Sequence, residues 1–220
     1  SGPWILAEYQ NATGTGNWFN VTFYRSFTCS DYLNGVSNRL YFKFNATDSY
    51  GFSNESSIAY VVLEKDNVEF IPVEGTSGQI INREGDETIN LVVLINDTDA
   101  GTPVGSGVNG SIRITTDGLN YDSGHANRTN SSGHLIYVFN ATCDYSNGTQ
   151  YWLANITQDE QCYEHAEMDS PDSINVKGQL KINLNQPPYL SEFNVTEDVF
   201  VNFTISTDCS SEGNISGATI

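Results

Sequence analysis

The stretch VFVNFTIS, at residues 199–206, decides the fold class. Val199, Val201, Phe203 and Ile205 stand at its odd positions and alternate with the polar residues Asn202, Thr204 and Ser206. A period of two is typical of a β-strand with one buried and one solvated face. The same alternation runs through residues 18–24 and 40–45, and no window of a dozen residues holds an apolar stripe at helical spacing. The sequence therefore predicts a protein that is nearly all β.

Further short strands are predicted along most of the chain, at residues 58–63, 89–95, 111–115, 134–139, 150–156 and 174–184. Turn-rich stretches at residues 96–110 and 118–133 separate some of them. Short strands at this spacing favour immunoglobulin-like β-sandwiches over alternating strands and helices. The predicted fold class is all-β, with two such sandwiches in tandem.

Two proline-containing stretches, Ile71-Pro72-Val73-Glu74-Gly75 and Asn185-Gln186-Pro187-Pro188, punctuate the chain. Proline cannot donate to a sheet ladder and biases the preceding residue toward extended backbone, so both stretches are predicted linkers. They enclose residues 75–185, which have the size of one complete immunoglobulin-like sandwich. Residues 1–74 then resemble the C-terminal part of a sandwich, and residues 186–220 resemble the N-terminal part of the next.

Joining Ile220 to Ser1 would create a continuous strand and turn, with the third strand of the last part beginning at Ser216. We therefore expect the chain to be one period of a head-to-tail array, in which residues 186–220 are completed by residues 1–74 of the next period or subunit. The chain's expected partner is thus itself. The array is either a covalent repeat or a set of subunits joined by strand complementation, which would cover otherwise bare sheet edges. The alternative is a two-domain fragment whose first and last parts fold together within one chain.

The charge of the chain excludes some partners. The chain has 220 residues, of which 27 are acidic and 9 basic, for a net charge of −18. Such a surface repels the phosphate backbone of nucleic acids and anionic lipids. No apolar run approaches the roughly 20 residues of a membrane-spanning helix, so neither nucleic-acid binding nor membrane insertion of this segment is expected.

Asparagine-X-Ser/Thr motifs are far more frequent than composition requires. Fourteen of the 24 asparagines begin such a sequon, whereas chance would give about four or five. The motif is the acceptor for N-linked glycans, which are added on the secretory route, so we expect an extracellular or cell-surface glycoprotein. The sequon asparagines are Asn11, Asn20, Asn45, Asn54, Asn96, Asn109, Asn127, Asn130, Asn140, Asn147, Asn155, Asn194, Asn202 and Asn214.

Three segments carry a resemblance to a known class of proteins. Residues 83–89, with the sequence REGDETI, the following LVVL at 91–94, and GHLIY at 133–137 resemble the immunoglobulin-like repeats of archaeal and bacterial cell-surface glycoproteins. The segment at residues 185–188 is similar to the opening of a further repeat, and residues 143–152 with Cys162 are similar to the disulfide-bearing hairpin of the class. The resemblance implies an extracellular tandem array, as in surface layers, adhesins or filaments, and it implies no catalytic residues.

The four cysteines are an even number, which in an oxidising compartment indicates two disulfides. We predict that Cys143 pairs with Cys162, closing a local loop. Cys29 then pairs with Cys209, possible only if the first and last parts of the chain, or of adjacent periods or subunits, form one sandwich. A zinc site from Cys143, Cys162 and His165 lacks a fourth ligand at standard spacing.

Metal and catalytic motifs are sparse. Asp97 and Asp99, in a loop after a predicted strand, are calcium candidates, although solvated turn aspartates are commoner than bound ions. None of the three histidines lies in a motif with a nucleophile. We therefore expect no enzyme and no cofactor beyond N-linked glycans and the calcium candidate.

The sequence favours a structural role, as a repeat or subunit of an extracellular glycosylated filament or surface array. The alternative is an adhesin stalk or a carbohydrate-binding or partner-binding module of the cell surface. Its sugar contacts would come from aromatic residues such as Tyr9, Trp18, Tyr151 and Trp152, although aromatics at strand spacing are more often core residues or cross-strand pairs.

Overall fold

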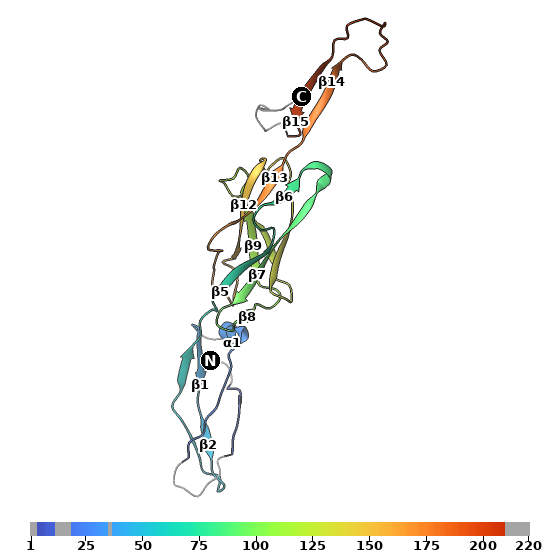
Figure 1. Cartoon of the computed structure of the whole chain (residues 1–220). Helices are drawn as coiled ribbons and strands as arrows, with labels where there is room; N and C mark the ends of the chain where they lie inside the picture. Colours follow the sequence, from blue (N-terminus) through green and yellow to red (C-terminus); the bar gives the residue numbers. More distant parts are fainter. Residues whose placement is uncertain (1–3, 12–18, 35–36, 210–220) are drawn as a thin grey trace. The chain divides into compact units, whose positions relative to one another are not determined.

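The structure is a computed structural model that describes residues 4–11, 19–34 and 37–209, apart from the side chain of Asp86 (Figure 1). The sequon at Asn214, the strand expected from Ser216 and the junction of the two chain ends lie outside the described residues. The chain divides into two compact units, Ser1–Glu64 and Lys65–Ile220, called here the N-terminal and C-terminal units. Strands dominate the described residues, whose helical segments are α1 (Cys29–Asn34) and the 3₁₀ turn η1 (Glu84–Asp86). The predicted all-β class is confirmed.

The N-terminal unit contains two small antiparallel sheets. Strand β1 (Arg39–Phe42) pairs with β4 (Ala59–Val62), and β2 (Asn45–Thr47) pairs with β3 (Ser53–Glu55). The β2–β3 turn is held by the carboxylate of Asp48, which accepts hydrogen bonds from the amides of Tyr50 and Phe52. The strand predicted at residues 18–24 is not formed by residues 19–24, which have no ladder partner in the described chain. No described residue of this unit is buried.

The C-terminal unit contains a five-stranded and a four-stranded sheet. The order of the first sheet is β10 (His125–Arg128), β9 (Asn109–Ile114), β12 (Gly148–Ile156), β13 (Asp172–Lys177) and β6 (Gln79–Asn82). The order of the second is β11 (His134–Asn140), β7 (Thr88–Asp97) and β5 (Val68–Glu74), with the short β8 (Thr102–Pro103) also pairing with β7. All pairings are antiparallel except that of β13 with β6.

The two sheets share one hydrophobic core. Alternate residues of β7 and β9 are buried, as the period of two in the sequence predicts. Trp152 of β12 is fully buried, and its indole N–H donates a 2.7 Å hydrogen bond to the carbonyl of Gly75. The largest fully buried side chains come from both sheets: Trp152, Phe139, Ile81, Leu91, Ile95, Ile112, Ile114, Leu135, Ile156 and Ile174.

The predicted boundary after residue 74 is wrong. Strand β5 crosses the stretch expected to be a linker, and Pro72 lies opposite Val93 of β7. Proline is tolerated here because β5 is at the edge of its sheet, where one side of the strand needs no donor. The division between the compact units instead follows Glu64.

The predicted boundary after residue 185 is also misplaced. The single strand expected at residues 174–184 is two strands, β13 and β14 (Leu180–Gln186), and β14 pairs with β15 (Asn202–Thr207) in a separate sheet, the C-terminal hairpin (Figure 1). Pro187 and Pro188 follow β14 directly. The predicted sandwich of residues 75–185 therefore ends inside a strand, and the change of sheet lies at Gly178 and Gln179.

Candidate functional site

Both predicted cysteine pairs are wrong. Cys143 is bonded to Cys209, with a Cα–Cα distance of 5.5 Å, and Cys29 and Cys162 are also disulfide-bonded. The bond from Cys143 to Cys209 leaves neither cysteine available for its predicted partner, and it joins residues 66 apart in the sequence instead of closing the local loop. The oxidised cysteines also remove the zinc alternative with His165.

A buried ion pair adjoins the Cys143–Cys209 bond. Arg83 precedes η1, its side chain is 4% exposed, and its guanidinium lies 3.3 Å from Asp208 Oδ1. The guanidinium also donates to the carbonyl of Tyr145, and the amide of Asp208 donates to the carbonyl of Gln179. We call Arg83, Asp208 and the Cys143–Cys209 bond the clamp. The clamp joins the C-terminal hairpin to the two-sheet part of its unit.

The sequon asparagines are mostly accessible. Nine are exposed, namely Asn11, Asn20, Asn45, Asn54, Asn127, Asn130, Asn147, Asn194 and Asn202, and four are half-buried, namely Asn96, Asn109, Asn140 and Asn155. The half-buried Asn96 donates its side-chain amide to Glu69 Oε1 at 3.1 Å. The Oδ1 atom of Asn155 is buried without a hydrogen-bond partner. The exposed sites present their side chains where an added glycan can extend into water.

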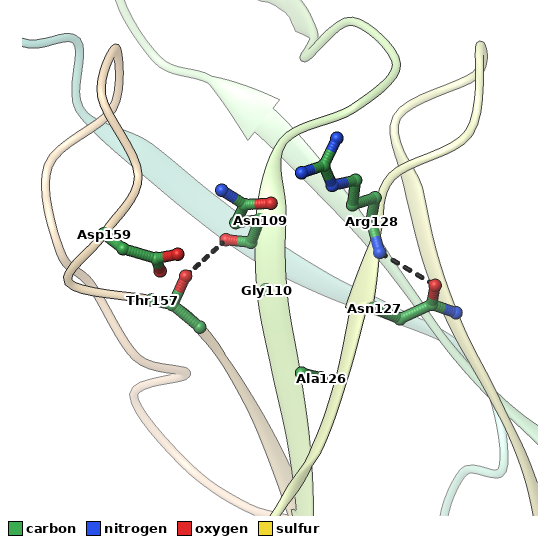
Figure 2. A pocket seen from close by; sticks show the side chains of 7 residues that line it. All are labelled: Asn109, Gly110, Ala126, Asn127, Arg128, Thr157 and Asp159. Carbon is green, nitrogen blue, oxygen red and sulfur yellow. Dashed lines mark hydrogen bonds between the residues drawn. The ribbon is translucent and has the colours of Figure 1, made fainter.

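One surface hollow, of about 280 Å³, contains two of these asparagines (Figure 2). It is lined by Asn109, Gly110, Ala126, Asn127, Arg128, Thr157 and Asp159. Figure 2 shows Thr157 donating to the carbonyl of Asn109 and the Arg128 amide donating to Asn127 Oδ1. The lining residues include no histidine, cysteine or serine, and the one hydroxyl side chain among them, that of Thr157, donates to the carbonyl of Asn109.

A second polar cluster connects the two sheets. The hydroxyl of Tyr145 donates to Asp122 Oδ2 at 2.9 Å, and the same oxygen lies 2.9 Å from Nε2 of His125. The His125 ring, on β10, stacks on Tyr137 of β11 with the ring centroids 3.9 Å apart. Burial, followed by the hydrogen bond to Asp122, raises the pKa of Tyr145. A tyrosine held in its neutral form is a structural donor rather than a nucleophile, so the cluster cross-links the sheets.

The calcium candidates have a local role. Asp97 is buried, and its Oδ1 accepts hydrogen bonds from the amides of Asp99 and Ala100 at 3.0 and 2.8 Å. This is the geometry of an Asx turn, in which a side-chain oxygen closes the loop. Within residues 4–11, 19–34 and 37–209, no three histidine, cysteine, aspartate or glutamate side chains gather closely enough to hold a metal.

The aromatic candidates for sugar binding are dispersed. Trp152 is a core residue, Tyr9 is exposed in the N-terminal unit, and Tyr151 is partly exposed on β12. Trp18 lies outside the described residues. Tyr151 and Trp152 are adjacent residues of β12 and point to opposite sides of the strand, so these two form no shared platform.

The C-terminal hairpin has an exposed apolar face. In its register Ile182 lies opposite Ile205 and Leu184 lies opposite Phe203, so these side chains share one side. Lys181, opposite Ser206, and Asn183, opposite Thr204, share the other side. Ile182 is 68% exposed. We call Leu180, Ile182, Leu184, Phe203 and Ile205 the tail face.

The N-terminal unit has a comparable face. Leu40 lies opposite Val61, and Phe42 projects to the same side two residues further along β1. Phe44 continues this side, contacts Phe42, and stacks on Phe23 with a centroid distance of 5.6 Å. Phe44 is 52% exposed. We call Phe23, Leu40, Phe42, Phe44 and Val61 the head face.

The alternation in the sequence indicates the apolar side of β15 and of β1. It does not indicate which strands pair with β15 and β1. The pairing of β14 with β15 was missed because residues 180–184 read as the continuation of a core strand.

Comparison with known proteins adds no assignment, since no protein-family model matches the chain and no curated protein matches it. None of the helices in the described chain has the length and apolar character to cross a membrane.

Proposed function

We propose that the chain is a structural subunit of an extracellular, glycosylated filament or surface array, assembled head to tail from immunoglobulin-like domains. The observation that carries this proposal is the pair of partly exposed apolar faces, one in each unit, which no further strand covers in the described residues. Two-stranded sheets are marginally stable alone, and contiguous exposed apolar patches usually mark interaction sites. The role is mechanical rather than catalytic.

The proposed domain type rests on the C-terminal unit. Its two sheets enclose one core around a buried tryptophan, and their pairing is almost entirely antiparallel. These are features of immunoglobulin-like sandwiches. The C-terminal hairpin and the N-terminal unit would each supply part of a further sandwich, in agreement with the resemblance to tandem surface repeats.

The proposed location rests on the cysteines and the sequons. All four cysteines are in disulfides, which persist in oxidising compartments. Nine sequon asparagines are exposed, as acceptors on the secretory route must be. Both observations favour an extracellular or cell-surface protein.

A carbohydrate-binding or partner-binding module is the second candidate, and the surface hollow of about 280 Å³ is the feature that favours it. Two residues of that hollow, Asn109 and Asn127, are themselves sequon asparagines. A glycan on either would occupy the hollow. This arrangement ranks the binding module below the structural role.

The test is to secrete the chain from a host that attaches N-glycans and to measure its size by sedimentation and negative-stain electron microscopy. We expect concentration-dependent linear oligomers and no selective signal on a glycan array. A chain that stays monomeric at every concentration and binds one glycan class would overturn the structural role in favour of the binding module.

A further inference from the structure

The tail face is an apolar strip that no second sheet covers in the described part of the chain. Leu180, Ile182 and Leu184 occupy alternate positions of β14, and each is more than half exposed. Phe203 and Ile205 of β15 lie directly opposite two of them. In a two-sheet domain such a strip is the inner side of one sheet.

The polar side of the hairpin shows which way the strip would face. Asn202, Thr204 and Ser206 alternate with the apolar residues of β15, and Asn185 donates to the Thr204 hydroxyl at 2.7 Å. Asn202 begins a sequon. A glycan at Asn202 therefore extends from the side opposite the tail face and leaves that face free.

The head face is also apolar, with Phe42 and Phe44 exposed and Phe23, Leu40 and Val61 half-buried. It combines side chains of β1 and β4 with two stacked phenylalanines. Lys43 and Glu55 form an ion pair on the opposite side, next to the sequon asparagine Asn45. Asn54 lies on the apolar side beyond Phe44, so the bare surface ends there.

Charge also distinguishes the two regions. The segment at residues 187–209 contains Glu192, Glu197, Asp198 and Asp208 and no basic residue. The N-terminal unit contains three of the nine basic residues, and one of them, Arg39, lies over the Tyr60 ring with no ion-pair partner in the described chain. The N-terminal unit also contains Glu8, Asp31, Asp48, Glu55 and Glu64, so charge favours the approach of the acidic segment only at Arg39.

A second copy of this chain is the occupant that fits both faces at once. Every copy carries one head face and one tail face, so each apolar face finds one partner and no third component is required. In the hairpin and in the β1–β4 sheet, each strand also has an edge without a neighbouring strand in the described chain. When two different surfaces of identical subunits bind each other, each subunit can add another at its free end. Such a contact gives a closed ring only if the rotation between neighbouring subunits closes, and otherwise it gives an open linear array.

The clamp prepares the hairpin for this contact. The Cys143–Cys209 bond and the buried Arg83–Asp208 pair hold β15 beside the two-sheet part of its unit. Ordering a free hairpin would subtract from the free energy of association, and a hairpin already held avoids that loss.

We propose that the tail face of one copy packs on the head face of the next copy and completes one two-sheet domain between them. This inference rests on the proposed function and names the surfaces that perform it. Leu180, Ile182 and Leu184 would then be buried against Leu40, Phe42 and Phe44.

The test places a carboxylate in each face of the full-length glycosylated chain. Ile182→Asp charges the tail face, with Asn183→Asp as the control on the opposite side of the same strand. Phe42→Asp charges the head face, with the neighbouring Tyr41→Asp as its control. All four substitutions are at exposed positions, and intact disulfides with unchanged near-ultraviolet circular dichroism establish that each variant folds.

We expect sedimentation to show at least a tenfold loss of assembled mass for Ile182→Asp and for Phe42→Asp, and little change for the two controls. An equimolar mixture of the two charged variants should form dimers and nothing longer, because only one intact head face and one intact tail face can meet. If the wild type assembles and the Ile182→Asp variant assembles equally well, this docking is overturned but the proposed function stands. A wild-type chain that remains monomeric would overturn the proposed function itself.

Discussion

Gly75 determines how closely two strands of the four-stranded sheet can approach. Its φ is +74°, in the left-handed region that favours glycine, and a Cβ there would overlap Leu91 Cδ2 and lie 3.1 Å from the Asn90 carbonyl. The Gly75 carbonyl accepts the indole N–H of Trp152. A single residue without a side chain thus sets the position of the central tryptophan.

Gly75→Ala is therefore expected to destabilise the C-terminal unit more than Gly78→Ala. Gly78 has a φ of +84° and open space around the added Cβ, so alanine there should lower the free energy of unfolding by only about 1 kcal/mol. At Gly75 the overlap adds a packing term, for about 3 kcal/mol in all. Hydrogen exchange of the β12 amides measures this unit alone. Equal losses at the two sites would contradict the steric argument.

Stability should fall in alkaline solution. Burial raises the pKa of Tyr121, Tyr137, Tyr145 and Tyr163 in the folded protein. Since each folded pKa lies above the unfolded value of about 10, the stabilisation is complete below pH 10 and is lost as pH rises through the folded pKa. Each such tyrosine should steepen the fall of the unfolding free energy with pH by up to about 1.4 kcal/mol per pH unit.

Urea unfolding between pH 8 and 11 tests this slope. Tyr145→Phe should give a shallower alkaline fall than the wild type, because the substituted ring cannot ionise. Tyr189→Phe, at a position that is 92% exposed, is the matched control and should leave the slope unchanged. If the unfolding free energy of Tyr145→Phe falls with pH as steeply as that of the wild type, ionisation of the Tyr145 hydroxyl is not linked to unfolding.

At the scale of the elements, the clamp decides how the C-terminal hairpin is attached. We expect Arg83→Met to lower the unfolding free energy by about 3 kcal/mol, because it leaves the half-buried Asp208 carboxylate without its cation. The control is Arg113→Met, whose ion pair with Glu167 is partly exposed and should contribute less than about 1 kcal/mol. Faster hydrogen exchange of β14 and β15 in Arg83→Met would locate the loss at the hairpin. Similar losses for both variants would argue against a special role for the clamp.

How far the elements could be predicted depended on the range of the interactions. Strands at residues 89–95, 111–115, 134–139 and 150–156 were predicted because alternating burial is written in the local sequence, and the structure contains them. Residues 199–201 belong to the same predicted strand, yet β15 begins only at Asn202, where its partner β14 ends at Gln186. Residues 19–24 alternate too but form no ladder. Alternation predicts which side of a strand is apolar and leaves open whether a neighbour exists.

The sequence predicts which residue types matter, the sequon asparagines and the cysteines, but not which of these residues are covered or bonded to each other. The sequons were found from their motif alone, but the half-buried positions of Asn109 and Asn155 depend on what covers each strand. The bond from Cys143 to Cys209 joins residues 66 apart, and nothing in the local sequence marks that pairing. The sequence predicts a linker at Pro72 because proline is excluded from central strands. Pro72 is accepted in β5 because β5 is an edge strand, and the local sequence does not show that position.

At the scale of the whole molecule, the net charge of −18 opposes the proposed self-association. Repulsion between copies acts through solvent and is screened within about 10 Å at 0.1 M salt and about 3 Å at 1 M. Apolar contact between the head and tail faces is not weakened by added salt. Assembly should therefore strengthen as sodium chloride rises.

Sedimentation of the glycosylated chain between 0.05 and 1 M sodium chloride is the measurement. We expect larger assemblies at higher salt, with Ile182→Asp remaining monomeric throughout. Assemblies that dissolve as salt increases would mean that ion pairs, not the apolar faces, hold the copies together.

The cysteine bond between residues 143 and 209 also determines how the C-terminal unit would carry tension. A force applied to the hairpin is transmitted to the rest of the unit through two covalent connections. One runs through Gln179 into β13, and the other runs from Cys209 to Cys143, just beyond β11. Strand β13 belongs to the five-stranded sheet and β11 to the four-stranded sheet. The force is thereby divided between the two layers, so that neither sheet is peeled from the other strand by strand.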